Sequence, residues 1–183
     1  MSAADAWQVK HDRTGEFNIG WEMQEMLREL EPRRHEICVV LEIGTFQGDS
    51  LRIWREYLDP TLLIGIQDTD ETSPETAREV DAMMVIGKSQ SREAHAEVLR
   101  VLSGVAIDFL YIDGDHMYPS VRRDWELYEP LVRRGGIVIL HDAVIEDNDT
   151  VEVYRFYREV REGRQSKLLY GGHGSTGAAV IFV

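Results

Sequence analysis

The segment 38–50, CVVLEIGTFQGDS, constrains the fold of this chain more than any other. Its apolar beginning is too short for an ordinary helix and rich in β-branched residues, which predicts a buried parallel strand. Gly44 and Gly48 follow the strand, and a helical pattern begins at Asp49. A strand that turns through glycines into a helix places backbone N–H groups beside a crevice at the carboxyl end of a sheet. Glycine suits this turn because any Cβ would keep a ligand away from the backbone.

The glycine spacing narrows what the crevice can bind. A dinucleotide fingerprint needs G-x-G-x-x-G, whereas this segment has only Gly44 and Gly48. A Walker loop needs G-K-[ST], but Asp49 follows Gly48 and would repel a phosphate group. The pattern E-x-G-x-x-x-G, which begins at Glu42, favours a ligand with amine and hydroxyl donors and little phosphate. A plain β-to-α turn with glycine caps is the alternative at this point.

Short apolar runs alternate with amphipathic segments along the rest of the chain, which predicts an α/β domain. The last two runs flank a glycine-rich loop and predict a terminal hairpin, so that the last strand is antiparallel to an otherwise parallel sheet. Residues 1–16 are expected to form a flexible arm, and 17–183 one domain. The predicted strands are 38–43, 61–67, 83–87, 106–112, 137–140, 166–170 and 178–183.

Capping and breaking residues suggest where the intervening helices begin and end. Asn18 is expected to cap the first helix, which Pro32 would stop, and Thr150 to cap the last. Gly135 and Gly136 are expected to end the helix before the fifth strand. The predicted helices are 18–31, 49–58, a short one from Ser73, 92–102 with Ala94, Val98, Leu99 and Leu102 inward, one beginning near Pro119, and 150–162.

Composition excludes several classes of function. The chain has 20 Lys+Arg against 33 Asp+Glu and a net charge of −13, so it would repel naked nucleic acid. It has no apolar run of membrane-spanning length, and its first residues lack the apolar core of a signal peptide. The one cysteine, Cys38, falls in a predicted buried strand and forms no disulfide framework. We therefore expect a cytoplasmic protein that binds neither nucleic acid nor membrane.

The ends of two strands carry the strongest chemical signal. One strand runs into Asp113-Gly114-Asp115-His116, and the next into His141-Asp142. Because parallel strands end at one edge of a sheet, these side chains and Glu42 are expected to converge on one crevice. Carboxylates gathered away from water cost several kcal/mol unless a cation lies among them. A divalent metal is one such cation, and the sulfonium and amine of S-adenosylmethionine (SAM) are another.

Together these motifs resemble those of class I SAM-dependent methyltransferases. The resemblance lies in E-x-G-x-x-x-G, F-L-Y-I-D-G-D-H and G-G-x-x-x-x-H-D, and it spans about residues 17–142. It is nearest to short bacterial and phage-type O-methyltransferases, and the chain is also similar to catechol, caffeoyl-CoA and sugar O-methyltransferases. The resemblance implies a Rossmann-like α/β sandwich with a seven-stranded, mostly parallel sheet in the order 3-2-1-4-5-7-6.

The resemblance also implies a SAM site along the carboxyl edge of the sheet. Gln67 stands where the family has a ribose-binding acid, and Asp68 follows it. Ser89 would lie beside the adenine, and Asp115 would hold the amine. The expected cofactor-binding residues are Glu42, Gly44, Thr45, Phe46, Gly48, Ser50, Gln67, Asp68, Ser89, Asp113, Asp115 and His116.

The resemblance implies Asp113 and Asp142 as metal ligands, for Mg²⁺ or another divalent cation, and His141 is the third ligand that we expect beside Asp142. Metal-dependent relatives usually have an asparagine ligand after the second aspartate, and Ala143 stands there in this chain. A bound metal would lower the pKa of a substrate hydroxyl. Without a metal, His141 or His116 would act as the base, so the expected catalytic residues are His141, His116 and Asp113.

The sequence thus predicts a SAM-dependent methyltransferase acting on a hydroxyl of a small molecule, such as a sugar or natural product. Two alternatives stay open at this point. One is a SAM-fold binding protein without catalysis. The other is a metal-dependent phosphoesterase, built on Asp113, Asp115, His116, His141 and Asp142. The segment after the fifth strand is short, so another subunit of a homo-oligomer could complete the substrate pocket.

Overall fold

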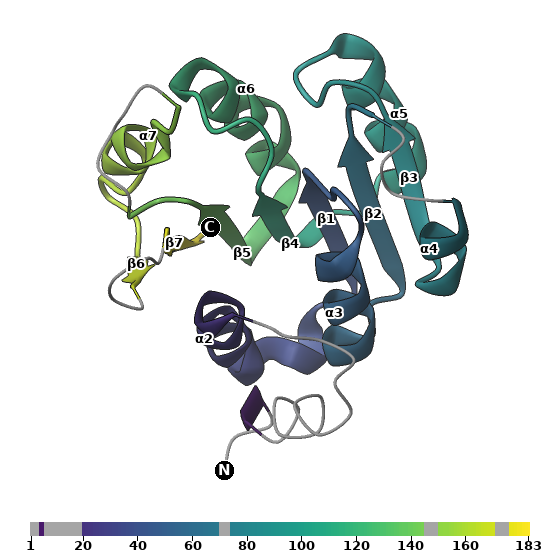
Figure 1. The fold of residues 1–183 in the computed structure, drawn as a ribbon, viewed down its shortest axis with the longest axis horizontal. Coiled ribbons are helices and arrows are strands. Elements are labelled where there is room, and N and C mark those ends of the chain that lie inside the picture. The colour runs from purple at the N-terminus through teal and green to yellow at the C-terminus, as the bar shows by residue number, and fades with distance from the viewer. Residues whose placement is uncertain (1–3, 6–19, 70–73, 145–149, 171–175) are drawn as a thin grey trace.

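The protein is an α/β sandwich in which helices cover both faces of one sheet (Figure 1). A computed structural model describes residues 4–5, 20–69, 74–144, 150–170 and 176–183. The seven strands lie in the order β3-β2-β1-β4-β5-β7-β6, which confirms the predicted topology. Their bounds are β1 Val39–Ile43, β2 Leu62–Gln67, β3 Ala82–Ile86, β4 Ile107–Ile112, β5 Val132–His141, β6 Ser166–Leu169 and β7 Ala178–Phe182.

Strands β1 to β5 are parallel to one another, and β7 is antiparallel to both β5 and β6. Strand β1 pairs with β2 on one side and with β4 on the other, so the strand order reverses there. The carboxyl ends of β1 and β4 therefore flank the place where open α/β sheets bind ligands.

Helices α5, α6 and α7 cover one face of the sheet, and α2 and α3 cover the other (Figure 1). None of the helices in the described segments is long and apolar enough to cross a membrane. The helix bounds are α2 Trp21–Leu30, α3 Asp49–Leu58, α4 Pro74–Glu79, α5 Arg92–Leu102, α6 Tyr118–Tyr128 and α7 Val153–Val160, with short 3₁₀ helices at η1 Glu31–Glu36 and η2 Glu129–Leu131.

The two faces of the sheet carry separate hydrophobic cores because side chains alternate along each strand. In β1, Val39 and Leu41 pack toward α5, α6 and α7. Val40, between them, packs toward α2 and α3. All five residues of β1 are buried, as expected for a central parallel strand. This central strand delivers the glycine turn to the edge where the ligand site is expected.

Helix α2 ends at Leu30, which agrees with the predicted stop at Pro32. Pro32 itself lies at the start of η1, where its missing N–H costs no hydrogen bond. Two other predicted boundaries were wrong for local reasons. Gly135 and Gly136 lie inside β5, where Gly135 has a φ of +76° and a side chain at Gly136 would collide with Val132. The last helix begins at Val153 after an N-cap at Glu152, not at a cap on Thr150.

Two burial predictions were also wrong. Cys38 lies just before β1 and is exposed, and Leu99 of α5 is 43% exposed. The predicted caps at Asn18 and Ser73 lie outside the described residues, as do 171–175 of the hairpin loop. Of the predicted arm, the structure describes residues 4–5 only; Ala4 is buried, and Asp5 forms a 2.7 Å ion pair with Arg28.

Asp108 of β4 is a buried carboxylate that fixes the start of the central strand. Its Oδ2 atom accepts hydrogen bonds from the backbone N–H groups of Cys38 and Val39, both at 2.8 Å. Its Oδ1 atom accepts a hydrogen bond from the guanidinium of Arg133, in β5. The carboxylate thus ties three adjacent strands together at their amino ends.

We expect Asp108→Ala to lower the free energy of unfolding by about 2–4 kcal/mol, because it leaves the buried Val39 N–H, the partly buried Cys38 N–H and the Arg133 guanidinium without their acceptor. Urea unfolding followed by circular dichroism measures this. Glu126→Ala is the control, since its ion pair with Arg122 is exposed and contributes under ~1 kcal/mol. Equal midpoints for the two variants would contradict the structural role of Asp108.

Candidate active site

A cavity of about 550 Å³ opens at the carboxyl ends of the strands around the reversal of strand order. Its volume is in the range of small-molecule sites. The walls combine the glycine turn after β1, the ends of β2 and β3, and the acidic segment after β4. The residues lining it are Ile43, Gly44, Phe46, Ile66, Gln67, Asp68, Gly87, Lys88, Ser89, Gln90, Asp113, Gly114, Asp115, His116 and Ser120.

The expected cofactor-binding residues divide into two groups in the structure. One group does not line the cavity, and it consists of Glu42, Thr45, Gly48 and Ser50. The other group lines it, and it consists of Gly44, Phe46, Gln67, Asp68, Ser89, Asp113, Asp115 and His116. The roles of both groups in holding a ligand stay predictions, but the second group is within reach of one.

The glycine turn is shaped by close packing between strands. Gly44 has a φ of +86°, and a Cβ there would collide with the carbonyl oxygen of Asp113. Glycine is therefore required for the approach of β1 to β4, a different reason from the ligand access that the sequence suggested. Phe46, with a φ of +43°, donates its backbone N–H to Gln67 Oε1 at 3.0 Å. The Gln67 amide thus supports the turn from the neighbouring strand.

Glu42 lies beneath this turn and is fully buried. One carboxylate oxygen accepts a hydrogen bond from the Trp54 indole Nε1 at 2.8 Å, and the other accepts one from Ser50 Oγ. Burial raises the pKa of Glu42 to about 8, although these two hydrogen bonds oppose the rise. Glu42 thus joins β1 to α3 and supports the cavity from below.

Asp115 fixes the start of α6 at the rim of the cavity. Its two oxygens accept hydrogen bonds from the Met117 backbone N–H at 3.0 Å and from Ser120 Oγ at 2.6 Å. The bond to the N–H two residues on is an Asx turn, which precedes the N-cap residue Met117. A carboxylate held in this way faces the cavity in a fixed position.

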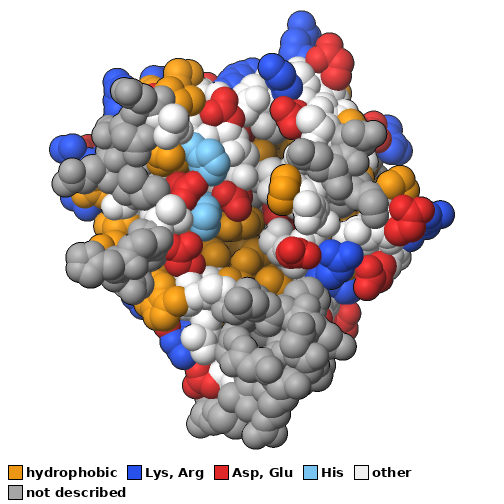
Figure 2. Space-filling model, in the orientation of Figure 1, with side chains coloured by type: hydrophobic (Ala, Val, Ile, Leu, Met, Phe, Trp, Pro, Cys, Tyr) orange, Lys and Arg blue, Asp and Glu red, His pale blue; other side chains and the backbone are white. Residues whose placement is uncertain are grey.

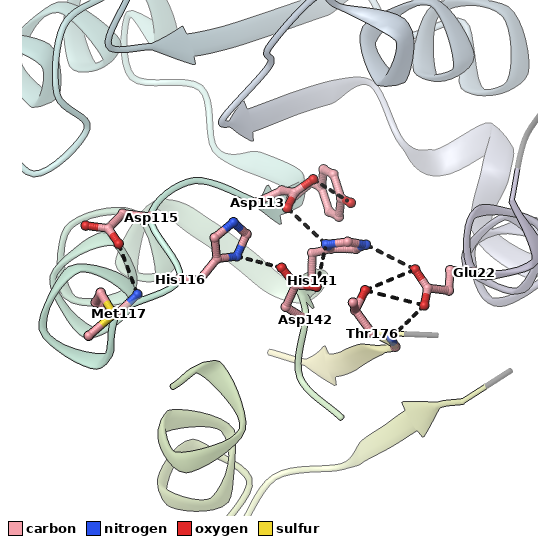
Figure 3. A network of polar contacts seen from close by, with 10 residues as sticks. Glu22, Asp113, Asp115, His116, Met117, His141, Asp142 and Thr176 are labelled. Atoms are coloured by element: carbon pink, nitrogen blue, oxygen red, sulfur yellow. Dashed lines mark hydrogen bonds and ion pairs between the residues drawn. The ribbon is translucent and has the colours of Figure 1, made fainter. Parts of the chain in front are cut away.

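Asp113, His141 and Asp142 form a compact cluster beside the cavity (Figure 3). Each offers one ligand atom, and these atoms all lie within 4.8 Å of one another. The Nδ1 atom of His141 lies 3.0 Å from Asp113 Oδ1 and 3.4 Å from Asp142 Oδ1. Asp113 follows β4 and His141 ends β5, so adjacent parallel strands bring the cluster together.

Further side chains hold this cluster from three sides. Tyr111 of β4 donates its hydroxyl to Asp113 Oδ2 at 3.2 Å. His116 Nδ1 lies 2.6 Å from Asp142 Oδ2. Glu22, from the first turn of α2, places its Oε2 atom 3.2 Å from His141 Nε2. The sequence analysis missed Tyr111 and Glu22, and no spacing in the sequence links Glu22 to β5.

The close carboxylates shift the pKa values of both histidines upward. Burial alone would lower the pKa of His141, but its contacts with Asp113, Asp142 and Glu22 raise it to about 12. The Asp142 carboxylate raises the pKa of His116. Burial alone would raise the pKa of Asp142, but its contacts with His116 and His141 hold it well below its usual range. Without a further cation, the imidazole rings thus carry the positive charge that this edge requires.

The cluster also fits a divalent cation. The Nδ1 atom of His141 is buried and has no hydrogen-bond partner among the described residues, although two carboxylate oxygens lie near it. Two oxygens and an imidazole nitrogen facing one point are a donor set that divalent metals accept. Ala143, the next residue, is buried and offers no ligand atom.

A second buried carboxylate supports the opposite wall of the cavity. Asp124 of α6 is fully buried and accepts a hydrogen bond from Gln90 Nε2 at 2.9 Å. Burial raises its pKa to about 7, against the opposing effect of hydrogen bonds from Ser89 and Gln90. Tyr128 donates its hydroxyl to the Ser89 carbonyl at 2.7 Å. An acid on the apolar face of α6 was the sequence signal for this support, and the sequence analysis did not use it.

Family comparison agrees with this fold and site. A family model described as "Methyltransferase domain" matches residues 41–143, which is more than half of the chain. The chain therefore belongs to this methyltransferase family, as its motifs predicted.

Relatives of known name are longer than this chain. L-olivosyl-oleandolide 3-O-methyltransferase of Streptomyces antibioticus is 25% identical over 149 residues, which cover 76% of this chain and 34% of that protein. Demethylmacrocin O-methyltransferase of Streptomyces fradiae is 26% identical over 132 residues, or 68% of this chain and 32% of that protein. Protein R132 of Acanthamoeba polyphaga mimivirus is 32% identical over 56% of this chain and 50% of its own length. The chain thus spans half or less of these relatives.

Solved structures share the fold at low sequence identity. The O-methyltransferase TomG of Streptomyces achromogenes, in complex with SAM, has a TM-score of 0.66 and 18% identity over 100% of this chain and 90% of that one. The MycE methyltransferase, in complex with Mg, SAH and mycinamycin VI, has a TM-score of 0.63 and 15% identity over 98% of this chain and 54% of that one. These similarities confirm the class I methyltransferase fold.

The buried carboxyl of Asp124 predicts how stability depends on pH. Its pKa is raised in the folded state, so the folded protein binds more protons than the unfolded chain between about pH 4 and pH 7. The free energy of unfolding therefore falls as pH rises through this window. We expect Asp124→Asn, which cannot ionise, to gain stability relative to the unmodified chain by a few kcal/mol between pH 5 and pH 7.5. Urea unfolding at each pH measures the difference, and parallel pH curves would contradict it.

Proposed function

We propose that the chain is a SAM-dependent methyltransferase that methylates a hydroxyl group of a small molecule, with a divalent cation at Asp113, His141 and Asp142. One observation carries the proposal: Asp113 lines the cavity and also belongs to the cation cluster. A methyl donor bound in the cavity and an acceptor oxygen bound at the cluster would therefore lie next to each other, on either side of the Asp113 carboxylate. The family and the fold support the same assignment.

The cavity offers groups suited to each part of SAM, which supplies an electrophilic methyl group on its sulfonium. Gln67 and Asp68, at the end of β2, are placed for the ribose hydroxyls. Ser89 and Gln90, supported by Asp124, are placed for the adenine. The carboxylates of Asp113 and Asp115 would attract the amine and the sulfonium charge. TomG, with the same fold, is known in complex with SAM.

A cation at the cluster would lower the pKa of the acceptor hydroxyl and fix its position. Asp113, His141 and Asp142 would hold it, and the buried Nδ1 atom of His141 supports this arrangement. MycE, which shares the fold, was solved with Mg. Alignment of the acceptor oxygen with the methyl–sulfur bond is the main requirement of this displacement, and a fixed cluster on adjacent strands provides it.

His116 is the best placed base in the structure. The Asp142 carboxylate holds its Nδ1 atom, and its other ring nitrogen points away from Asp142 (Figure 3). The ring also lines the cavity and is 37% exposed, so a substrate hydroxyl can reach it. With a cation among the carboxylates, the positive charge on His116 would no longer be required there, and the ring could be neutral. The hydroxyl proton would then pass to His116 as the oxygen–methyl bond forms and the sulfur–methyl bond breaks.

The acceptor surface combines charge with apolar area. Figure 2 shows hydrophobic side chains in a hollow beside pale blue histidine and red acidic side chains. A hydroxylated molecule with apolar parts, such as a glycosylated natural product, matches this combination. One of the Streptomyces relatives, L-olivosyl-oleandolide 3-O-methyltransferase, is named for methyl transfer to a molecule of that kind. A cytoplasmic location and a homo-oligomer that completes the acceptor pocket stay predictions.

The two alternative functions have less support. A two-metal phosphoesterase needs more ligands than one cluster supplies, and among the described residues only Asp113, His141 and Asp142 form such a group. A binding protein without catalysis would not require a base held by a carboxylate at the cavity, as His116 is.

Calorimetry with SAM tests the cofactor part of the proposal. We expect the full chain to bind SAM and Gln67→Ala to bind it about tenfold more weakly, because the variant loses the support of the Phe46 N–H and a ribose contact. Asp59→Asn is the control, since Asp59 ends α3 away from the cavity and asparagine tolerates its φ of +51°. No heat with SAM, or equal affinity in both variants, would contradict the assignment.

Transfer of labelled methyl groups tests the catalytic part. We expect His116→Gln to lower the rate by about 10²–10⁴-fold on a panel of glycosylated and polyhydroxylated acceptors, because the base is lost. The affinity for SAM should stay within about twofold, which separates catalysis from binding. Unchanged transfer in His116→Gln would show that another group takes the proton.

A further inference from the structure

His141 is clamped on both sides of its ring. On the cluster side, Nδ1 faces oxygens of Asp113 and Asp142. On the opposite side, Nε2 lies 3.2 Å from Glu22 Oε2. Figure 3 shows Glu22 reaching the ring from α2, a helix distant from β5 in the sequence. The ring thus lies between a carboxylate from the amino-terminal helix and the proposed cation position.

Glu22 is itself held in place and is not an adaptable surface acid. Its Oε1 atom accepts a hydrogen bond from the Gly177 backbone N–H at 2.7 Å. Thr176 donates its hydroxyl to the same carboxylate, at 3.4 Å from Oε2. The Glu22 side chain is only 20% exposed. Three parts of the chain therefore meet at this carboxylate: the start of α2, the end of β5 and the residues before β7.

A fixed carboxylate beside one ring nitrogen of a histidine determines whether the other nitrogen carries a proton or a lone pair. When Nε2–H donates to a carboxylate, the neutral ring presents its lone pair at Nδ1. In metal sites this pairing orients the histidine ligand and makes it more basic. Here the lone pair would face the two aspartate oxygens and complete a set of one nitrogen and two oxygens.

We propose that Glu22 orients His141 so that Nδ1 is the third ligand beside Asp113 and Asp142, and that this nitrogen makes the site prefer a first-row transition ion to Mg²⁺. This inference rests on the cation site of the proposed function. Mg²⁺ favours oxygen ligands and keeps its waters, whereas imidazole suits ions such as Co²⁺, Ni²⁺ and Zn²⁺. Among first-row divalent ions, the affinity of a mixed nitrogen and oxygen site rises from Mn²⁺ through Co²⁺ and Ni²⁺ to Cu²⁺ and falls again at Zn²⁺.

The rival arrangement is a metal-free network in which the ring donates to carboxylates from both nitrogens. The metal-free network and the metal site use the same four side chains in the same positions. They differ in metal binding, because the rival arrangement offers no lone pair at Nδ1. Ala143 offers no ligand atom in either case, so no amide oxygen can replace the nitrogen at that position.

The test is metal binding by the full chain, without an affinity tag and freed of metal with EDTA. Titration with Co²⁺ followed by visible absorption reports the ligand set, and calorimetry with Zn²⁺ and Mg²⁺ reports selectivity. We expect Zn²⁺ to bind at least about 100-fold more tightly than Mg²⁺. His141→Asn should remove most of this preference and shift the Co²⁺ spectrum, while Mg²⁺ affinity changes by less than about threefold.

Variants of Glu22 test the positioning role. Glu22→Ala should weaken Zn²⁺ and Co²⁺ binding by about 10–100-fold, and Glu22→Gln, which keeps an oxygen near Nε2, should restore part of the loss. Glu25→Gln is the matched control, since Glu25 lies on the same helix and pairs with Arg28. Thermal unfolding of the metal-free variants checks that each one folds.

Equal affinity for Zn²⁺ and Mg²⁺ in the unmodified chain would overturn the proposal. So would full Zn²⁺ affinity in Glu22→Ala, or Co²⁺ bound only weakly with the spectrum of exposed carboxylates. These measurements use neither SAM nor an acceptor. A chain that selects Zn²⁺ but transfers no methyl group would contradict the proposed function alone, and one that transfers methyl groups without metal selectivity would contradict this inference alone.

Discussion

Negative charge gathered at one edge of the sheet is the constraint on which the structure of this site depends. Asp113 and Asp142 follow the adjacent strands β4 and β5. Glu22, from helix α2, contacts the His141 ring that lies beside them. Carboxylates so close together destabilise the fold unless positive charge lies among them. The two imidazole rings supply that charge in the protein alone, and a divalent cation or a sulfonium can supply it in a complex. Ligand binding and the stability of this edge are therefore coupled.

Buried polar contacts in both hydrophobic cores hold the walls of the cavity in place. Glu42 joins β1 to α3 on one face, and Asp124 supports the wall formed by Ser89 and Gln90 on the other. Both acids have raised pKa values because they are buried, so they stabilise the fold most when they are protonated. Their role is to position backbone and neighbouring side chains, which leaves contact with ligands to the residues that line the cavity.

Much of the fold could be predicted from the sequence because local patterns and the global topology agree. Apolar runs located the strands, and the family motifs implied the sheet order. The proximity of Asp113, His141 and Asp142 could also be predicted, because they lie at the ends of adjacent parallel strands. Their role as metal ligands stays a prediction. Glu22 could not be predicted, because it reaches His141 only through the packing of α2 beside β7. The position of Gly135 inside β5 was also missed. From the sequence, a pair of glycines predicts the end of a helix, whereas here it lies at an irregularity in the pairing of β5 with β4.

The arrangement of cation and methyl donor can be measured by anomalous diffraction from a crystal grown with S-adenosylhomocysteine and soaked with Zn²⁺. We expect one zinc peak bounded by Asp113, His141 and Asp142, with the cofactor sulfur on the cavity side of Asp113. A zinc peak elsewhere, with the cofactor away from the glycine turn after β1, would contradict this arrangement.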